Sequence, residues 1–193
     1  MEGKIRRVVT GHDANGKAVI LEDRDAPNVH TNPLRPGHIS TELWKTHAAP
    51  APVTREEPDP TDGPKIQIPP RNGTVFRISE IGPETEAIRN IDASQAREIF
   101  KAMGNEQGST FGQNQRHPYM HRTQTIDYAV VLEGEVTMLL DDSEVQLKTG
   151  DVVIQRGTNH AWSNRSKKPV KMLYVLIDGQ FDEELQPRFG NGH

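Results

Sequence analysis

The segment from His121 to Asp178 consists of short β-prone runs that turn residues separate at short, regular intervals. Such a pattern is typical of an antiparallel sandwich or barrel, because each tight turn returns the chain beside the strand it has just left. The segment contains no internal repeat, so we expect one barrel rather than two. The separating turns are Glu133-Gly134, Asp141-Asp142-Ser143, Thr149-Gly150-Asp151, Arg156-Gly157 and Ser166-Lys167-Lys168-Pro169.

Two further β elements are expected upstream of this segment. The run from Thr74 to Ser79 is β-prone and predicts a strand. Nearer the N-terminus, the β-prone runs 6–10 and 17–21 flank the dipeptide Asn15-Gly16. Because Asn-Gly favours a tight hairpin turn, we predict a β-hairpin at the start of the chain.

Residues 25–73 hold ten of the fourteen prolines. Proline lacks a backbone donor, so we expect neither a central strand nor a long helix in this stretch. The stretch still contains Trp44 and several aliphatic residues, which disordered segments tend to lack. We therefore predict an extended arm that lies against the domain or against a second subunit, and a homodimer. The expected division is 1–73 as hairpin and arm, 74–178 as barrel and 179–193 as tail.

One short helix is predicted between Asp92 and Met103. Asp92 is a candidate N-cap with Gln95 three residues later, and Gly104 stands where the helix would stop. An apolar stripe on this helix would pack on the outside of the barrel. The stripe consists of Ala96, Ile99, Phe100 and Met103.

Composition excludes several classes of function. The net charge is -4 and no block of Lys or Arg is present, which argues against nucleic acid as a partner. Cysteine is absent, so a metal would need histidine, carboxylate or water as ligands. The sequence shows neither a signal-like N-terminus nor an apolar run of the ~20 residues that a membrane helix needs. We expect a cytoplasmic protein with a small-molecule ligand and no membrane partner.

Strand parity brings candidate metal ligands together, because alternate side chains of a strand share a face. One strand presents His121, Thr123, Thr125 and Asp127 on a single face. A later strand presents His160, Trp162 and Asn164. If both faces line the barrel interior, two histidines and one carboxylate converge on one point. Such a set is typical of non-haem iron and also suits zinc, copper or manganese.

The same segment resembles the two motifs of the cupin family. The first motif normally reads G-x5-H-x-H-x3,4-E-x6-G, and this chain carries His121-x-Thr123-x3-Asp127-x6-Gly134. The second normally reads G-x5-P-x-G-x2-H-x3-N, and here it runs from Gly150 through Gly157 to His160 and Asn164. The resemblance covers about a third of the chain directly. It implies an all-β fold, a single jelly-roll barrel over residues 74–178.

This sequence differs from the cupin motifs at positions that affect the metal site. The leading glycine of the first motif and the proline of the second are missing, Thr123 replaces the second histidine, and Asp127 replaces glutamate. Cupins normally hold a metal through three histidines and one glutamate, so the resemblance carries over only His121, Asp127 and His160. They would hold one divalent ion, with Asp127 either a direct ligand or one water away. His117 is the candidate replacement for the missing histidine.

The run from Arg156 to Trp162 also resembles microbial cupins found near biosynthetic clusters, some of them described as oxidoreductases that tailor polyketide or aromatic products. This implies a metal-dependent oxidoreductase in which His117 and Arg156 are catalytic groups that orient or protonate the substrate. Thr123, Thr125 and Trp162 would line the substrate pocket, although Arg156 also fits a solvated turn. Two alternatives stay open: a non-redox isomerase, dehydratase or decarboxylase, and a non-enzymatic small-molecule-binding cupin.

Overall fold

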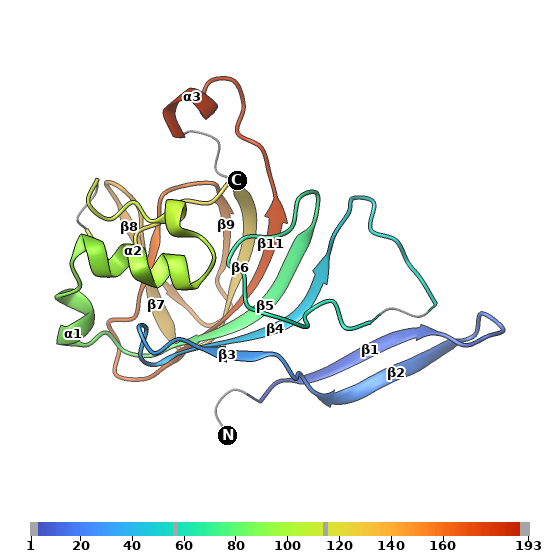
Figure 1. Cartoon of the computed structure of the whole chain (residues 1–193). Coiled ribbons are helices and arrows are strands. Elements are labelled where there is room, and N and C mark those ends of the chain that lie inside the picture. Colours follow the sequence, from blue (N-terminus) through green and yellow to red (C-terminus); the bar gives the residue numbers. More distant parts are fainter. Residues whose placement is uncertain (1–3, 56–57, 114–115, 190–193) are drawn as a thin grey trace.

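The computed structural model of the 193-residue chain describes residues 4–55, 58–113 and 116–189. A six-stranded sheet of order β3-β4-β5-β11-β6-β9 and a three-stranded sheet of order β10-β7-β8 form the barrel (Figure 1). All paired strands are antiparallel, as the turn pattern predicts. The strands are β3 (Val29–Thr31), β4 (His38–Thr46), β5 (Thr74–Ile81), β6 (Thr125–Glu133), β7 (Glu135–Leu139), β8 (Glu144–Lys148), β9 (Val152–Arg156), β10 (Ala161–Ser163) and β11 (Val170–Asp178).

Strand β6 shows the alternation that the sequence predicts. Ala129 and Val131 are buried, whereas Tyr128 on the opposite parity is exposed. The inward apolar residues of β6 pack with Val136 and Met138 of β7 and Met172 of β11 in a core between the two sheets. Farther toward the start of β6 the inward positions are polar. The apolar core therefore fills one end of the barrel, and the other end is left for a polar cavity.

Two glycines of the cupin-like motifs make turns that other residues adopt only with strain. Gly134 joins β6 to β7 with a φ of 85°, and Gly150 joins β8 to β9 with a φ of 92°. At Gly134 a Cβ would also lie 3.2 Å from the carbonyl oxygen of Pro169. Glycine is needed at both turns because L side chains rarely adopt this left-handed region.

Strand β4 corrects the prediction that residues 25–73 contain no central strand. It is nine residues long and pairs with β3 on one side and β5 on the other. The segment His38–Thr46 contains no proline, and the nearest prolines are Pro36 and Pro50. The strand therefore forms between the prolines, and the barrel sheet begins well before residue 74.

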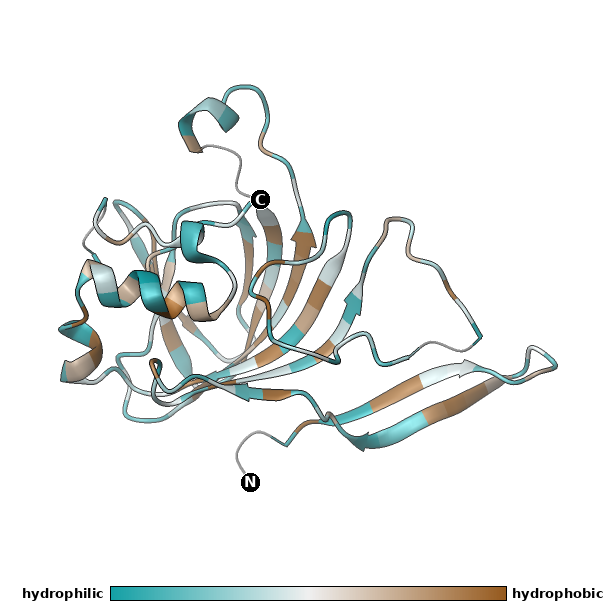
Figure 2. Cartoon of the chain, viewed as in Figure 1, coloured by the Kyte–Doolittle hydropathy of each residue, from teal (hydrophilic) through white to brown (hydrophobic). Residues whose placement is uncertain are grey.

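The predicted N-terminal hairpin is confirmed as β1 (Arg6–His12) and β2 (Ala18–Asp25). It projects from the barrel (Figure 1), and hydrophobic residues recur along it as they do along the barrel strands (Figure 2). Arg7 is buried and joins the hairpin to its neighbours. Its guanidinium donates to the carbonyl oxygen of Leu43 (3.2 Å) and pairs with the carboxylates of Glu22 and Asp59.

The predicted helix is α2 (Ala93–Ala102), and its capping box of Asp92 and Gln95 is confirmed. Its predicted packing through Ile99, Phe100 and Met103 is confirmed. The apolar stripe packs against Tyr119, Met120, Leu139 and Ala161, and Met103 lines the cavity at the open end of the barrel. The helix therefore lies against this end of the barrel.

The structure also contains short helical turns that the sequence did not predict. They are α1 (Glu86–Arg89), the 3-10 turn η1 (Glu106–Gly108) and α3 (Gln186–Phe189). Each of them is four residues long or shorter, whereas the predicted helix α2 has ten residues. Within the described ranges, every helix falls short of the length and apolar character needed to cross a membrane.

Candidate functional site

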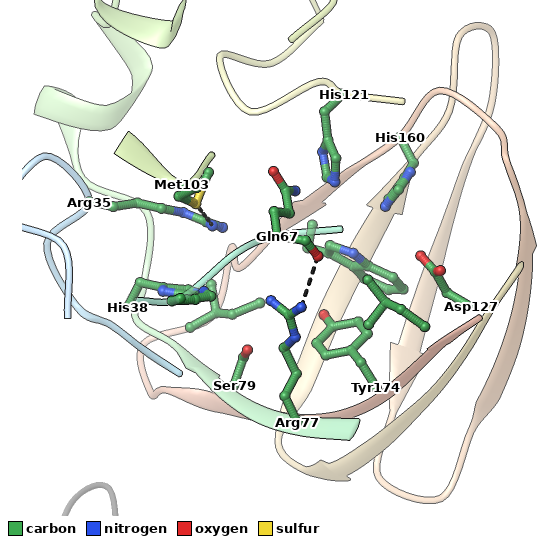
Figure 3. Close-up of a pocket in the computed structure, with 14 residues that line it drawn as sticks. Arg35, His38, Gln67, Arg77, Ser79, Met103, His121, Asp127, His160 and Tyr174 are labelled. Atoms are coloured by element: carbon green, nitrogen blue, oxygen red, sulfur yellow. Dashed lines mark hydrogen bonds between the residues drawn. The ribbon is translucent and has the colours of Figure 1, made fainter. Parts of the chain in front are cut away.

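The open end of the barrel holds a polar cavity of about 540 Å³, part of it open to solvent. Side chains from β4, β5, β6 and β11 meet there with residues of the loops and of the α2 end (Figure 3). The lining residues are Arg35, His38, Lys65, Gln67, Arg77, Ser79, Ile81, Met103, His121, Asp127, His160, Trp162, Tyr174 and Leu176.

His121 and His160 stand side by side at the cavity wall, as the parity argument predicts. Their backbones form an antiparallel bridge, in which each N–H donates to the other's carbonyl oxygen at 2.9 Å. The centroids of the two imidazole rings are 4.3 Å apart. Backbone pairing between two segments far apart in the sequence therefore brings the two rings together.

Backbone carbonyls determine how the two rings are oriented. Nδ1 of His121 lies 2.9 Å from the carbonyl oxygen of Tyr119, and Nδ1 of His160 lies 3.0 Å from that of Thr158. A carbonyl only accepts, so Nδ1 of His121 carries the proton and its Nε2 keeps a lone pair. At His160 a donor faces the same Nδ1, because the amide Nε2 of Gln155 lies 3.0 Å from it and 3.0 Å from the Thr158 carbonyl oxygen. An Nδ1–H held by a carbonyl is the usual support of a metal-binding histidine.

Both imidazoles are neutral at pH 7. Burial lowers the pKa of His160 to about 4, although its hydrogen bond to Thr158 opposes the shift. Burial also lowers the pKa of His121 well below its ordinary value, and the neighbouring His160 adds to that effect. Desolvation disfavours the charged imidazolium. Each neutral ring therefore has one nitrogen lone pair that can bind a ligand without the loss of a proton.

Asp127 enters the same cavity from β6. The residue is buried, and its Oδ1 has no hydrogen-bond partner within the described part of the chain. Burial raises the pKa of its carboxyl to about 6, against the opposing effects of a hydrogen bond with Thr125 and of the charge on Arg77. A buried carboxylate oxygen without a partner is unusual and calls for a ligand or water.

The residues present fit a divalent ion in part. The described residues contain no group of three or more His, Cys, Asp or Glu side chains close enough to hold one ion. The two histidines are neutral and lie close together, as a metal site needs, and Asp127 lines the same cavity. The convergence of all three on one ion, with Asp127 as a direct ligand or one water away, stays a prediction.

The predicted catalytic pair does not reach the cavity. His117 is buried elsewhere, where Nδ1 accepts from the Tyr119 N–H (3.1 Å) and Nε2 lies 2.8 Å from Oε1 of Glu84. Because both ring nitrogens have protein partners, His117 neither replaces the missing motif histidine nor meets a substrate there. Arg156 is exposed at the end of β9 and lines a different surface depression. The prediction that these two residues act in the cavity is contradicted by their positions.

The three predicted pocket residues divide in the same way. Trp162 lines the cavity, with its ring edge-on to His160 (centroids 5.8 Å apart) and to Tyr174 (5.7 Å). Thr123 and Thr125 are buried, and their hydroxyl groups form a hydrogen bond with an oxygen–oxygen distance of 2.7 Å. Neither threonine is among the residues that line the cavity. Their role is to support the strand beside Asp127.

Sequence reasoning missed the cationic side of the cavity, which Arg35, Lys65 and Arg77 form. Arg77 had a signal in the sequence, because it lies between the apolar residues Phe76 and Ile78 in the predicted strand. Arg35 and Lys65 had none. Both come from proline-rich loops on either side of β4, and a loop has no periodicity that indicates where its side chains point.

Fold and site together define a class of protein: a single antiparallel β-barrel with a histidine pair inside a polar cavity at one end. Residues 109–176 match the family model described as a cupin domain. A phomopsin biosynthesis cluster protein, C', from Diaporthe leptostromiformis is 30% identical over 181 residues, which cover 90% of this chain and 78% of that protein. The chain belongs to the cupin superfamily.

Other relatives carry the same family name. The cupin-domain-containing oxidoreductase fogC of Aspergillus ruber is 29% identical over 182 residues, 91% of this chain and 73% of that protein. The cupin-domain-containing oxidoreductase virC of Hypocrea virens is 26% identical over 179 residues, 89% and 75% of the two chains. Among solved structures, the Cnp3 cupin domain of Schizosaccharomyces pombe superposes with a TM-score of 0.41 at 12% identity and covers 99% of this chain and 98% of its own.

Proposed function

We propose that this protein is a metal-dependent cupin oxidoreductase that tailors a small organic molecule of aromatic or polyketide type. The observation that carries the proposal is the pair of neutral imidazoles, His121 and His160, whose ring centroids lie 4.3 Å apart at the wall of one cavity. The names of the oxidoreductase relatives support the reaction class. These relatives are 29% and 26% identical to this chain.

His121 and His160 would hold one divalent ion, and Asp127 would contact it through water. When bound, an iron, manganese or copper ion supplies a redox centre, and zinc supplies a Lewis acid. Around it, this chain's residues keep the imidazoles neutral and oriented. Trp162 and Tyr174 form an aromatic wall that suits a flat organic ligand and excludes water.

Metal binding is the first test. Titration calorimetry with Fe²⁺, Mn²⁺, Zn²⁺ and Cu²⁺ should show one ion bound per chain, and His160→Ala should abolish that binding. His12→Ala, which removes an exposed hairpin imidazole, is the matched control and should bind as the wild type does. Binding that survives in His160→Ala, or no binding of any of the four ions to the wild type, would contradict the proposal.

A non-redox reaction is the second candidate, and Asp127 favours it. Its carboxyl is buried, has an oxygen without a partner among the described residues, and lies in the ligand cavity. A carboxyl with a pKa near neutrality is suited to proton transfer. Product mass distinguishes the candidates: an oxidoreductase changes the oxidation level of its product, whereas an isomerase leaves the mass unchanged and a dehydratase removes water.

A further inference from the structure

We propose that the cavity takes an organic acid and holds its carboxylate between Arg35, Lys65 and Arg77, opposite the two histidines. The proposal deepens the proposed function, because it names the substrate class for the same cavity. Three cations and a single acid, Asp127, are found among the side chains that line the cavity. Figure 3 shows the guanidinium groups of Arg35 and Arg77 toward the lower left of the cavity, with His38 beside them, and the imidazoles of His121 and His160 toward the top.

The carboxylates of the described residues neutralise these cations only in part. Glu42 is the carboxylate near Arg77, at 3.8 Å, and it is shared with Lys45, whose Nζ lies 2.5 Å from the other carboxylate oxygen. Arg35 rests over the ring of Tyr119 at 4.6 Å and near the sulfur of Met103 at 4.0 Å, and neither contact supplies a negative charge. Among the described residues, the cavity wall therefore carries more positive charge than its carboxylates balance.

Arg77 is positioned to bind an anion. Its side chain is almost fully buried, and NH2 donates to the carbonyl oxygens of Ile66 (3.2 Å) and Gln67 (2.8 Å), which hold the guanidinium in place. Its Nε is buried without a hydrogen-bond partner in the described part of the chain. A guanidinium with unused donors in a confined site favours a carboxylate, because the planar donor fork matches the two oxygens.

The surrounding charges agree with this geometry. Burial lowers the pKa of Arg35 and of Arg77, and burial together with these two guanidinium groups lowers the pKa of Lys65 well below its ordinary value. Cations that destabilise one another in a cavity bind an anion more strongly, because the anion relieves their repulsion. A bound carboxylate would also direct the remainder of the molecule toward Trp162 and the histidines.

Pairs of acid and amide test the proposal, with benzoate and benzamide, salicylate and salicylamide, and octanoate and octanamide as the probes. Calorimetry on the full chain should show at least one acid that binds about tenfold or more tightly than its amide, since a charge-assisted hydrogen bond is lost in the amide. If no acid binds better than its amide, the proposal is wrong. Inorganic phosphate that binds as tightly as the best acid would also overturn it.

Variants assign the binding to the three cations. Arg77→Gln and Arg35→Met should each lower the binding affinity for the acid by about tenfold or more. Arg97 is an exposed arginine of α2, and Arg97→Gln should leave that affinity unchanged. Arg35 is only half-buried, so Arg35→Met carries the test if Arg77→Gln does not fold. A folded Arg35→Met that binds the acid as the wild type does would overturn the proposal.

The metal titration separates this proposal from the function on which it rests. Arg35→Met should still bind one metal ion, and His160→Ala should still prefer the acid to its amide. Loss of the acid preference with intact metal binding would overturn the organic-acid proposal alone. Loss of metal binding in the wild type with an intact acid preference would overturn the metal-dependent function alone.

Discussion

At the scale of single residues, burial decides which histidines are charged. His38, His121 and His160 line one cavity, and burial is the largest influence that lowers the pKa of each. His38 lies beside Arg35, Lys65 and Arg77, and these charges lower its pKa further. Neutral imidazoles among cations keep the cavity from accumulating still more positive charge at neutral pH.

The pH dependence of stability follows from His38. Its pKa in the folded state lies well below the unfolded value of 6.5, so below pH 6.5 the unfolded chain binds a proton that the folded chain does not. Its contribution is therefore present above pH 6.5 and lost as the pH falls, by up to about 1.4 kcal/mol per pH unit. Urea unfolding between pH 7 and pH 5 should show a shallower pH slope for His38→Gln than for the wild type.

A matched control makes this measurement specific. His12 is exposed on the hairpin, and His12→Gln should leave the wild-type pH slope unchanged. The overall stability of His38→Gln is not the readout, because the substitution also changes packing. An identical slope in His38→Gln and the wild type would show that His38 binds its proton equally well in both states.

At the scale of elements, helix α2 connects the fold to the site. Phe100 is 1% exposed and packs with Ile99 and Met103 in a second core. The Phe100 ring centroid lies 5.2 Å from that of His121. The helix therefore both closes the barrel end and supports one of the candidate metal ligands.

Phe100→Ala tests that connection. We expect the free energy of unfolding to fall by about 3 kcal/mol or more, because the substitution leaves a cavity in a packed core. Chemical denaturation measures the change, and Phe100→Leu should lose much less. Metal affinity should fall in Phe100→Ala as well, since His121 loses its neighbour. A stability within error of the wild type would show that α2 contributes little to the fold.

At the scale of the whole molecule, apolar side chains remain on the outside of the barrel. Tyr128 of β6 is 44% exposed and lies opposite Ile154 of β9, which is 55% exposed. In the proline-rich stretch after β4, Val53 is 87% exposed beside the groove that Trp44 lines. Neighbouring exposed apolar residues of this kind mark contact surfaces.

We predict a homodimer, and light scattering should give about twice the chain mass of 21.6 kDa. Ile154→Lys and Val53→Lys place a charge on the sheet face and on the arm respectively, so the variant that produces monomers identifies the contact. The arm is the expected contact, because it carries Trp44 and aliphatic residues between prolines. A wild-type chain that is monomeric at micromolar concentration would contradict the prediction.

Local patterns were sufficient for the barrel and for half of the site. The two-residue period of a strand predicted that Asp127 faces the barrel interior and Tyr128 faces the exterior. The glycines of the motifs marked turns that need a left-handed backbone. The same period, with motif spacing, paired His121 with His160 across distant segments. Strand faces and glycine turns depend on neighbours along the chain, so a sequence pattern expresses them directly, whereas the pairing of the two histidines was predicted with the help of the family's motif spacing.

Tertiary packing decided the remaining features of the site. It placed His117 against Glu84 instead of in the cavity, and it brought Arg35 and Lys65 in from proline-rich loops. It also inserted β4 into the sheet between two groups of prolines. A loop has no period, and the distance between two side chains on different strands depends on how the sheets pack, so neither is encoded in a local pattern.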